Sequence, residues 1–575
     1  MRYLAGSVLV AIAAGVALPN SAGAVETESV LSRDRPVRVM MGPRGYRRRR
    51  LEEKKDPVAP LGEGDLAFFK GGLTAHETKK LLDGYLDRML ATYAKEEGFP
   101  KGLAEFLKEN RDVAEVFVTA IDPVYDDVGA AAKVFEDLRA ADAKLVEKYV
   151  HLATALAVVY DTPDAVSTSR YHSLWAVTKE QFYELPKCRE VWECYTDPRL
   201  KRRFGFALDK LPWPILVHLV DNDVNDKDRK WSLGKYNGRS TKIAKLYPSV
   251  KYDNDKLGGK SPKLGTNPYT LPNLLKYGGV CVDQAHFSSR VAKCLGVPAM
   301  KVTGKGRYGG AGHAWMGYLV IRKGRPSLEF TGRYFHDYYY TGNVFDPQTR
   351  TMTLDRFVAM MYDGASLSYP KYNRARMLVR MAEGIKADHS AEAVELVQEA
   401  LKLNYFNMWG WPLLMDFIKG EALPKKEGLS WANKMMKALK DHPDMTYHCL
   451  GTFIDCIPEK ETRKRQSLFG QAAKLYAGRP DLLIKLRLEQ AEDLCRAEQK
   501  RAALNILMQT MVENSKEGSL SLPVMRRCVE LAEELGLKRQ AHGILRRADR
   551  EFPKKRGSEP SKAYAEFQSL LESLK

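Results

Sequence analysis

Cysteine is scarce in this chain, and long uncharged apolar runs are absent beyond its first residues. Only 8 cysteines occur among 575 residues, which excludes a small domain built on disulfides, although the pairs Cys188–Cys194 and Cys495–Cys528 stay open. No later apolar run approaches the ~20 residues that a membrane-spanning helix needs. No motif interleaves basic with aromatic residues, which argues against nucleic acid as a partner. The length predicts several domains with ordinary apolar cores.

The chain begins with a segment typical of a secretory signal peptide. Arg2 precedes an apolar stretch at residues 4–18, and Ala22-Gly23-Ala24 fits a small-x-small cleavage site. We therefore expect residues 1–24 to be removed by cleavage after Ala24. The mature protein is predicted to be secreted or to lie in the periplasm or cell envelope. A membrane anchor is the alternative, but the apolar stretch is short for one.

Basic residues dominate the segment that follows. Residues 25–60 have few large apolar side chains and contain four successive arginines, Arg47 to Arg50. They are predicted to form a disordered basic linker, which either binds an anionic surface or is simply solvated. The formal net charge of the whole chain is +19, which likewise favours anionic partners or only solubility.

Helical periodicity dominates both sides of a central mixed region. The sequence predicts an N-terminal helical domain at 61–161, a central α+β domain with an irregular lead-in at 162–370, and a C-terminal helical domain at 371–575. The fold class is therefore multidomain and predominantly α. Amphipathic segments of the C-terminal domain are centred on alanines at irregular intervals: Ala393, Ala432, Ala472, Ala503 and Ala541. This pattern indicates irregular helical repeats of the tetratricopeptide kind, which either bind a peptide or protein partner or only support the rest.

Four aspartates fall within eight residues of the central region: Asp221, Asp223, Asp226 and Asp228. Oxygen ligands at alternate positions could bind calcium. The cluster lacks the loop glycine and the terminal glutamate of an EF-hand, so we predict no metal site and no cofactor.

The stretch with the most chemical information begins at Gly278-Gly279 and leads into a predicted helix that starts at Cys281. Gly296 and Pro298 end this helix. Small or apolar residues follow one stripe of it, at steps of four and three: Cys281, Ala285, Ser288, Ala292 and Leu295. The unpaired N–H groups of a helix start favour a thiolate and can stabilise an oxyanion. Cys281 is therefore predicted to be a nucleophile, with a buried core thiol as the alternative.

A histidine follows at the start of a predicted strand. A strand at 299–304 and a glycine-rich turn lead to a second strand at 313–321, and a third is expected at 327–334. His313 thus begins a strand, where it could act as the base for a cysteine at a neighbouring helix start. A purely structural histidine is the alternative.

Four sequence motifs occur in order between residues 271 and 353: Gly278-Gly279-Val280-Cys281-Val282-Asp283-Gln284-Ala285, Leu295-Gly296-Val297-Pro298-Ala299, Gly312-His313-Ala314-Trp315 and Asp346-Pro347-Gln348-Thr349. In this combination the stretch resembles the transglutaminase-like superfamily. The resemblance implies a papain-like fold with a Cys-His-Asp triad. It makes Cys281 the nucleophile, His313 the general base and acid, and Asp346 the residue that orients His313.

The third member of that triad is open. Asp346 matches the family's Asp-Pro-x-Thr motif, but it follows His313 by 33 residues, about twice the usual distance in the family. Glu329 matches the spacing instead. An insertion at 332–343 would reconcile Asp346 with the fold, and we favour Asp346.

Four other polar residues lie near Cys281 in the sequence. Gln284 and His286 fall in the first turns of the predicted helix. We expect Gln284 only to hydrogen-bond locally and His286 to pack or to face solvent. An upstream side chain often completes the oxyanion hole in papain-like enzymes, and Asn273 and Tyr277 are available.

Together these features predict an exported cysteine enzyme that cleaves or transfers amide or isopeptide bonds of a protein or peptide substrate through a Cys281 thioester. Peptidase-like hydrolysis is favoured over transfer, because water is always present and no amine-binding site is recognisable. The alternative is a secreted, non-catalytic scaffold that binds partners through its C-terminal helical repeats.

Overall fold

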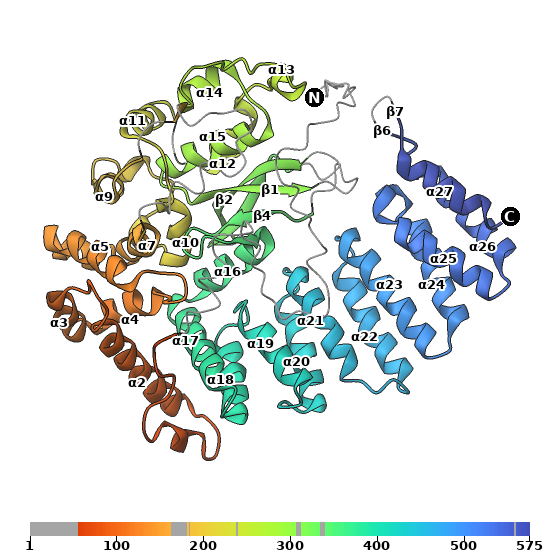
Figure 1. Ribbon diagram of the computed structural model, residues 1–575, viewed down its shortest axis with the longest axis horizontal. Helices are drawn as coiled ribbons and strands as arrows, with labels where there is room; N and C mark the ends of the chain where they lie inside the picture. The colour runs from red at the N-terminus through yellow and green to blue at the C-terminus, as the bar shows by residue number, and fades with distance from the viewer. Residues whose placement is uncertain are drawn as a thin grey trace. The chain divides into compact units, whose positions relative to one another are not determined.

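The computed structural model describes residues 56–162, 181–182, 185–236, 238, 240–305, 312–333, 340–556 and 559–575. The predicted signal peptide and nearly all of the basic linker lie outside these residues. The described chain forms two compact units, one of residues 56–305 and 312–428 and the other of residues 429–575 (Figure 1). The helical segment that the sequence predicts to begin at residue 371 is therefore divided between the two units.

The first unit begins with a series of helices, which belong to the same compact unit as the central sheet. Their bounds are η1 (Asp65–Phe69), α2 (Ala75–Tyr93), α3 (Lys101–Glu109), α4 (Arg111–Ala120), α5 (Val128–Ala141), α6 (Ala143–Lys148) and α7 (Val150–Tyr160). Residues 152–159 of α7 are buried on every side, because this helix is apolar all round and neighbouring helices cover it. Helix α7 packs against α4, α5 and α10 (Trp213–Val220).

The predicted irregular lead-in consists of short helices joined by ordered loops. These are α9 (Cys188–Thr196), η3 (Lys201–Arg203), η4 (Leu208–Lys210), α11 (Asp226–Lys235), α12 (Ser240–Ile243), η5 (Tyr247–Ser249), α13 (Asn254–Leu257) and α14 (Leu271–Tyr277). Several turns here are closed by side chains that cap short helices, such as the Asp253 carboxylate, which accepts from the amides of Asp255 and Lys256. The helix that begins at Cys281 follows directly after α14.

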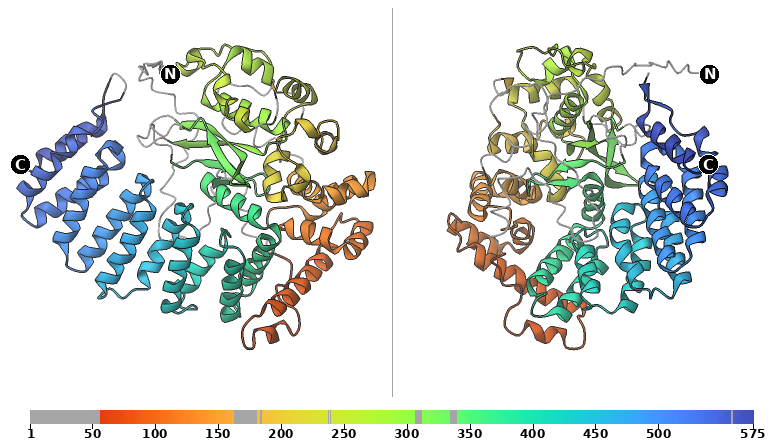
Figure 2. Two further views of the ribbon diagram at one scale, coloured as in Figure 1. Left: turned by 180° about the vertical axis from the view of Figure 1, so that it is seen from behind. Right: turned by 45° about the vertical axis from the view of Figure 1, so that its right-hand side comes forward.

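A five-stranded antiparallel sheet lies at the centre of the first unit (Figures 1 and 2). Its strands are β1 (Ala299–Lys305), β2 (Gly312–Arg322), β3 (Arg325–Thr331), β4 (Asn343–Phe345) and β5 (Met352–Leu354), in the order β3-β2-β1-β4-β5. Helix α15 (Cys281–Cys294) packs on β1 and β2, and α16 (Asp355–Leu367) packs on β3. The predicted small-residue stripe of α15 is fully buried at Ala285, Ser288 and Ala292, which allows the close approach to the sheet.

Helices continue from α16 to the end of the described chain. The bounds are α17 (Tyr369–Ile385), α18 (Ser390–Leu403), α19 (Gly410–Lys419), α20 (Lys425–Ala438), α21 (Pro443–Asp455), α22 (Thr462–Leu475), α23 (Pro480–Arg496), α24 (Lys500–Glu513), η7 (Ser515–Leu520), α25 (Leu522–Glu534), α26 (Lys538–Leu545), η8 (Ala548–Arg550) and α27 (Lys562–Glu572). A short hairpin of β6 (Lys555–Arg556) and β7 (Glu559–Pro560) precedes α27. The five alanines singled out by their recurrence fall in every second helix, α18, α20, α22, α24 and α26, and all are buried. The alternation is that expected of stacked helix pairs.

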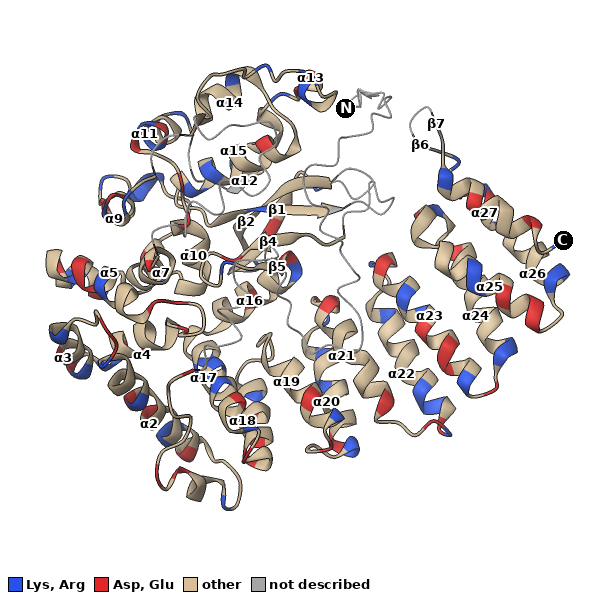
Figure 3. Ribbon diagram, viewed as in Figure 1, with Lys and Arg blue, Asp and Glu red and all other residues tan. Residues whose placement is uncertain are grey.

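Neither the charged residues of the second unit nor the cysteines gather at one place. Lys and Arg alternate with Asp and Glu along the helices of residues 429–575 (Figure 3). None of the eight cysteines, all of them among the described residues, forms a disulfide, so neither disulfide that the sequence left open is present. Within the described residues, no helix is both long and apolar enough to cross a membrane.

Candidate active site

Two glycines shape the entry to helix α15. Gly278 has a φ of 87°, and a Cβ on it would lie 2.5 Å from the carbonyl oxygen of Lys251. A Cβ on Gly279 would lie 2.4 Å from the Cβ of Asp283. Gly279 also pairs with Tyr252 in a parallel bridge, and its amide donates to the Lys251 carbonyl at 2.9 Å. Glycine is therefore required at both positions, because the lead-in crosses directly over the helix start.

Asp283 fixes the first turn of α15. Its carboxylate is buried and accepts hydrogen bonds from the Val280 amide, the Lys256 ammonium and the Tyr269 hydroxyl, each at 2.8 Å. The bond to the Val280 amide caps the helix, and a carboxylate at this end is favoured by the helix dipole. The Lys256 partner neutralises the buried charge, so the turn that presents Cys281 is held from three directions.

The Cys281 thiol is half-buried at this helix start. Burial raises its pKa, while hydrogen bonds from the Ala314 amide, the Tyr252 hydroxyl and the Val282 amide lower it. Burial has the larger effect, so the pKa lies above the ordinary thiol value. Burial thus opposes the thiolate that the helix start is predicted to favour, while three donors surround the sulfur.

His313 lies near the start of β2, opposite Gly304 of β1, and is 8% exposed. Its Nε2 lies 2.7 Å from the carbonyl oxygen of Gly332. Because a carbonyl only accepts, Nε2 carries the proton of this hydrogen bond, and Nδ1 is the basic nitrogen of the neutral ring. The imidazole also stacks on Trp315, with ring centroids 5.8 Å apart and planes 30° apart. The ring is thus held in one tautomer and one plane.

The two predicted reactive residues meet at one end of the sheet. The Ala314 amide that bonds the Cys281 sulfur belongs to the residue directly after His313. Helix α15 packs across β2 at this point, so the cysteine at the helix start reaches the beginning of the strand. The arrangement brings the Cys281 thiol close to the residue that follows His313, among several hydrogen-bond donors.

Asp346 lies elsewhere. It directly follows β4, whose Val344 pairs with Val302 of β1, whereas His313 pairs with Gly304. Continuing this register places Asp346 beside residue 300, four positions from Gly304, or about 13 Å along the strand. Its carboxylate accepts from the amides of Gln348 and Thr349 at 2.9 Å each. The structure therefore does not bring Asp346 to His313; the carboxylate closes its own turn.

Residues of that turn attach the sheet to the N-terminal helices. The Gln348 amide donates to the Ala120 carbonyl at 2.9 Å and to the Asp126 carboxylate at 2.7 Å. Arg350 forms a buried ion pair with Asp161. Burial raises the pKa of both aspartates. The Asp-Pro-Gln-Thr motif thus acts as a structural joint in this protein.

Glu329, the alternative third residue, does not orient His313 either. It lies on β3 opposite Tyr318 and forms an exposed ion pair with Arg322. Five positions separate Tyr318 from His313 on the same strand, a distance of about 16 Å. His313 contacts the Gly332 carbonyl instead. Every residue has a backbone carbonyl, so the sequence could not identify this partner.

Sequence reasoning also missed Tyr252. Of the residues proposed for an oxyanion hole, the Asn273 side chain donates to the Pro268 carbonyl at 2.8 Å, and the Tyr277 hydroxyl contacts Lys276 at 3.0 Å. Tyr252, 40% exposed, is the side chain whose hydroxyl reaches the Cys281 sulfur. The bridge between Tyr252 and Gly279 places it there, and a contact between segments 27 residues apart leaves no local pattern.

Of the two remaining polar residues, His286 packs as predicted, whereas Gln284 hydrogen-bonds to a distant segment and not locally as predicted. The Gln284 side-chain amide donates to the Val250 carbonyl at 2.8 Å, which ties α15 to the lead-in. His286 is buried, and its ring centroid lies 5.1 Å from that of Tyr269. Both residues support the helix that presents Cys281.

The aspartates considered for calcium are occupied by protein partners. Asp223 pairs with Arg290 at 2.6 Å, and Asp221 pairs with Lys293 at 3.3 Å, both beneath α15. Asp226 pairs with Lys230 on the surface, and Asp228 accepts from the Leu271 amide at 2.8 Å. Three of the four are buried, and they anchor α15 and α14.

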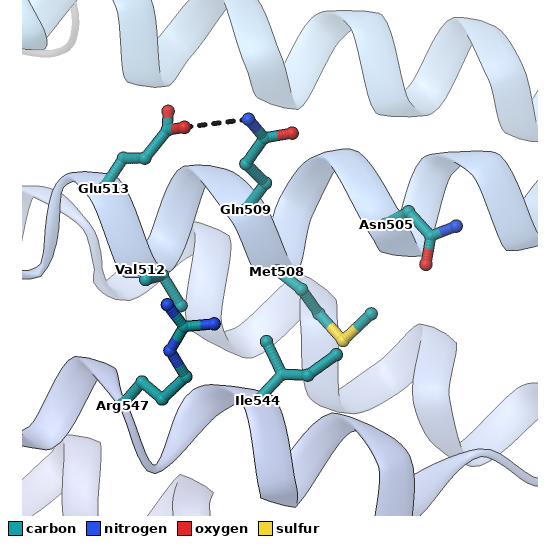
Figure 4. A pocket seen from close by; sticks show the side chains of 7 residues that line it. All are labelled: Asn505, Met508, Gln509, Val512, Glu513, Ile544 and Arg547. Carbon is teal, nitrogen blue, oxygen red and sulfur yellow. Dashed lines mark hydrogen bonds between the residues drawn. The ribbon is translucent and has the colours of Figure 1, made fainter.

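A second candidate site is a hollow in the unit of residues 429–575 (Figure 4). It has a volume of about 350 Å³ and is lined from α24 and from the end of α26 by Asn505, Met508, Gln509, Val512, Glu513, Ile544 and Arg547. Apolar side chains form its centre, and Gln509 donates to Glu513 at 2.8 Å on its rim. This combination suits binding rather than chemistry.

The chain matches no protein-family model, no curated protein and no solved structure. The function is therefore argued from the residues of the site.

Proposed function

We propose that this protein is an exported, transglutaminase-like cysteine enzyme that cleaves or transfers amide bonds of a protein or peptide through a thioester on Cys281. One observation carries the proposal: the Cys281 sulfur lies at the start of α15 between the Ala314 amide and the Tyr252 hydroxyl, and His313 directly precedes Ala314. A helix-start cysteine packed against a histidine-bearing antiparallel strand agrees with the papain-like arrangement that the sequence motifs imply. Export rests on residues 1–24 alone.

The chemistry follows from these positions. The Cys281 sulfur attacks the carbonyl carbon of an amide and forms a C–S bond, while the thiol proton passes to His313 Nδ1. The oxyanion of the tetrahedral intermediate accepts hydrogen bonds from the first amides of α15 and from the Tyr252 hydroxyl. Collapse breaks the C–N bond, and the proton on His313 goes to the departing amine.

The thioester then reacts with water or with a second amine. Attack by either breaks the C–S bond and returns the proton to the sulfur, so the enzyme is regenerated. Hydrolysis is the proposed main reaction, and transfer to an amine is the variant. Because burial keeps Cys281 protonated, His313 removes the proton during the attack instead of forming an ion pair beforehand.

Labelling of the thiol together with turnover tests this proposal. Iodoacetamide alkylation of Cys281, followed by mass spectrometry from pH 6 to 10, is expected to be slower than that of a free thiol at pH 6 and to rise at alkaline pH, since the thiol pKa is raised. A peptide library with and without a fluorescent primary amine then distinguishes hydrolysis from transfer. Product formation that persists in Cys281→Ala would refute the enzyme.

The hollow of Figure 4 supports a second candidate, a secreted scaffold that binds a partner through its helical repeats. The two candidates separate in one experiment. Under the scaffold function, partner capture survives Cys281→Ala and is lost in Ile544→Arg; under the enzyme function, turnover is lost in the first variant and kept in the second. Binding of an anionic surface by the basic segment of residues 25–60 would be a further property, outside the described residues.

A further inference from the structure

A buried tyrosine contacts the two residues whose backbone groups bond Cys281 and His313. Tyr247, in η5, is 2% exposed, and its hydroxyl donates to the Ala314 carbonyl at 2.7 Å. The face of its ring lies against Gly332, where a Cβ would come within 2.5 Å of the ring carbons. The two residues that Tyr247 touches are therefore those whose amide bonds the Cys281 sulfur and whose carbonyl bonds His313.

Gly332 could not be replaced without moving this contact. Its φ is 79°, in the left-handed region that favours glycine, and this conformation turns its carbonyl towards His313 Nε2 at 2.7 Å. The preceding Thr331 is tied to the same lead-in, since its hydroxyl donates to the Ala244 carbonyl at 3.1 Å. The end of β3 is thus fixed by the segment that carries Tyr247.

We propose that Tyr247 is the positioning residue of the Cys281–His313 pair, and that it does through the backbone what a third acidic side chain would do directly. Its ring packs on Gly332, whose carbonyl bonds Nε2, and its hydroxyl fixes the carbonyl of Ala314, the residue whose amide bonds the sulfur. The role in turnover rests on the proposed function, whereas the tautomer of His313 and the reactivity of Cys281 do not.

Other charged groups around the pair are the same in every variant considered below. At the helix start they are Asp283, with its partner Lys256, and the Tyr252 hydroxyl belongs to the same region. Beside Trp315 they are Arg333, whose guanidinium lies 4.8 Å from the ring centroid, and its partner Asp355. A changed response of Cys281 or His313 is therefore attributable to the substitution.

Two variants with matched controls test the proposal in the full-length protein. Tyr247→Phe keeps the ring on Gly332 and removes the hydrogen bond to Ala314. Its control is Tyr362→Phe, which removes an equally buried hydroxyl for which the described structure shows no hydrogen-bond partner. Gly332→Ala displaces the carbonyl, and its control is Gly324→Ala, with a φ of 76° and open space around the added Cβ. Circular dichroism verifies the fold of each variant.

The readouts are the ring nitrogens of His313 and the alkylation rate of Cys281. Long-range ¹H–¹⁵N correlation spectra, with His313→Gln to identify the signals, are expected to show the Nε2–H tautomer in the wild type and a mixture of tautomers in Gly332→Ala. Tyr247→Phe is expected to slow alkylation at pH 7 by about fivefold, the effect of one net hydrogen bond, and to move the alkylation profile to higher pH.

The opposite results overturn the proposal. They are an Nδ1–H tautomer in the wild type, or an alkylation profile of Tyr247→Phe identical to that of Tyr362→Phe. If Gly332→Ala does not fold, the Tyr247→Phe profile decides alone. Expected tautomer and alkylation results in a protein that turns over no amide would refute the proposed enzyme and leave the positioning role intact.

Discussion

The two ends of the central sheet are built by different means. At the Cys281 end, the groups that make the contacts are largely backbone: the Ala314 amide bonds the Cys281 sulfur and the Gly332 carbonyl bonds His313. At the Asp346 end, side chains make the contacts, through Gln348 to Asp126 and Arg350 to Asp161. The Asp-Pro-Gln-Thr motif thus lies at the structural end. At the Cys281 end, backbone groups orient the side chains, and backbone groups cannot be recognised from residue types.

The comparison also separates stability from chemistry. The Arg350–Asp161 pair is buried, so breaking it leaves a charge without compensation. The reactive end depends instead on hydrogen bonds to one sulfur and one imidazole. Substitutions at the two ends should therefore change different measurements.

The largest effect is expected at the reactive pair. Cys281→Ala or His313→Gln should lower amide turnover by about 10³-fold or more, because nucleophile and base act as a unit. Denaturant unfolding of the two variants should change far less than turnover does. If the two residues act together, the double variant should turn over amide as slowly as either single variant. A loss in the double variant equal to the product of the two single losses would contradict this.

Next comes the structural end. Arg350→Met should lower the free energy of unfolding by about 3–5 kcal/mol, because Asp161 is left buried and unpaired. The control is Arg322→Met, which breaks an exposed pair with Glu329 that is worth about 0–1 kcal/mol. Urea unfolding followed by circular dichroism measures both. Equal destabilisation by the two variants would remove the distinction between the ends of the sheet.

Tyr252 should affect catalysis without affecting the fold. Tyr252→Phe removes a hydroxyl that contacts the Cys281 sulfur, and loss of one oxyanion donor lowers kcat by about 10²-fold. Tyr277→Phe is the matched control, since its hydroxyl contacts Lys276 instead. Steady-state kinetics separate the roles: a rise in KM with unchanged kcat would assign Tyr252 to substrate binding alone.

The smallest effect on chemistry is expected at the two acids proposed from the sequence. Replacing a residue that orients a catalytic imidazole lowers kcat by about 10⁴-fold. Asp346→Ala and Glu329→Ala should each keep turnover of the folded enzyme within about one order of magnitude, because neither carboxylate contacts His313. A loss of about 10⁴-fold in Asp346→Ala would restore it to the triad.

Local patterns predicted much of the architecture. The helix from Cys281, the strands around His313 and the recurring alanines were all visible, because helix and strand periodicity and capping residues act over a few positions. The contact between Cys281 and the residue after His313 followed from a helix packing on the neighbouring strands. The role of Asp346 was not predictable, because the register of β4 on β1 depends on contacts across the sheet.

The sequence by itself determined which elements form and which cysteine stands at a helix start. Only the tertiary structure decided the environment of that sulfur: burial raises its pKa, and Tyr252 and Ala314 donate to it. It also decided that His313 is held by the Gly332 carbonyl. The physical reason is the same in each case, since desolvation and backbone hydrogen bonds arise only when distant segments pack together.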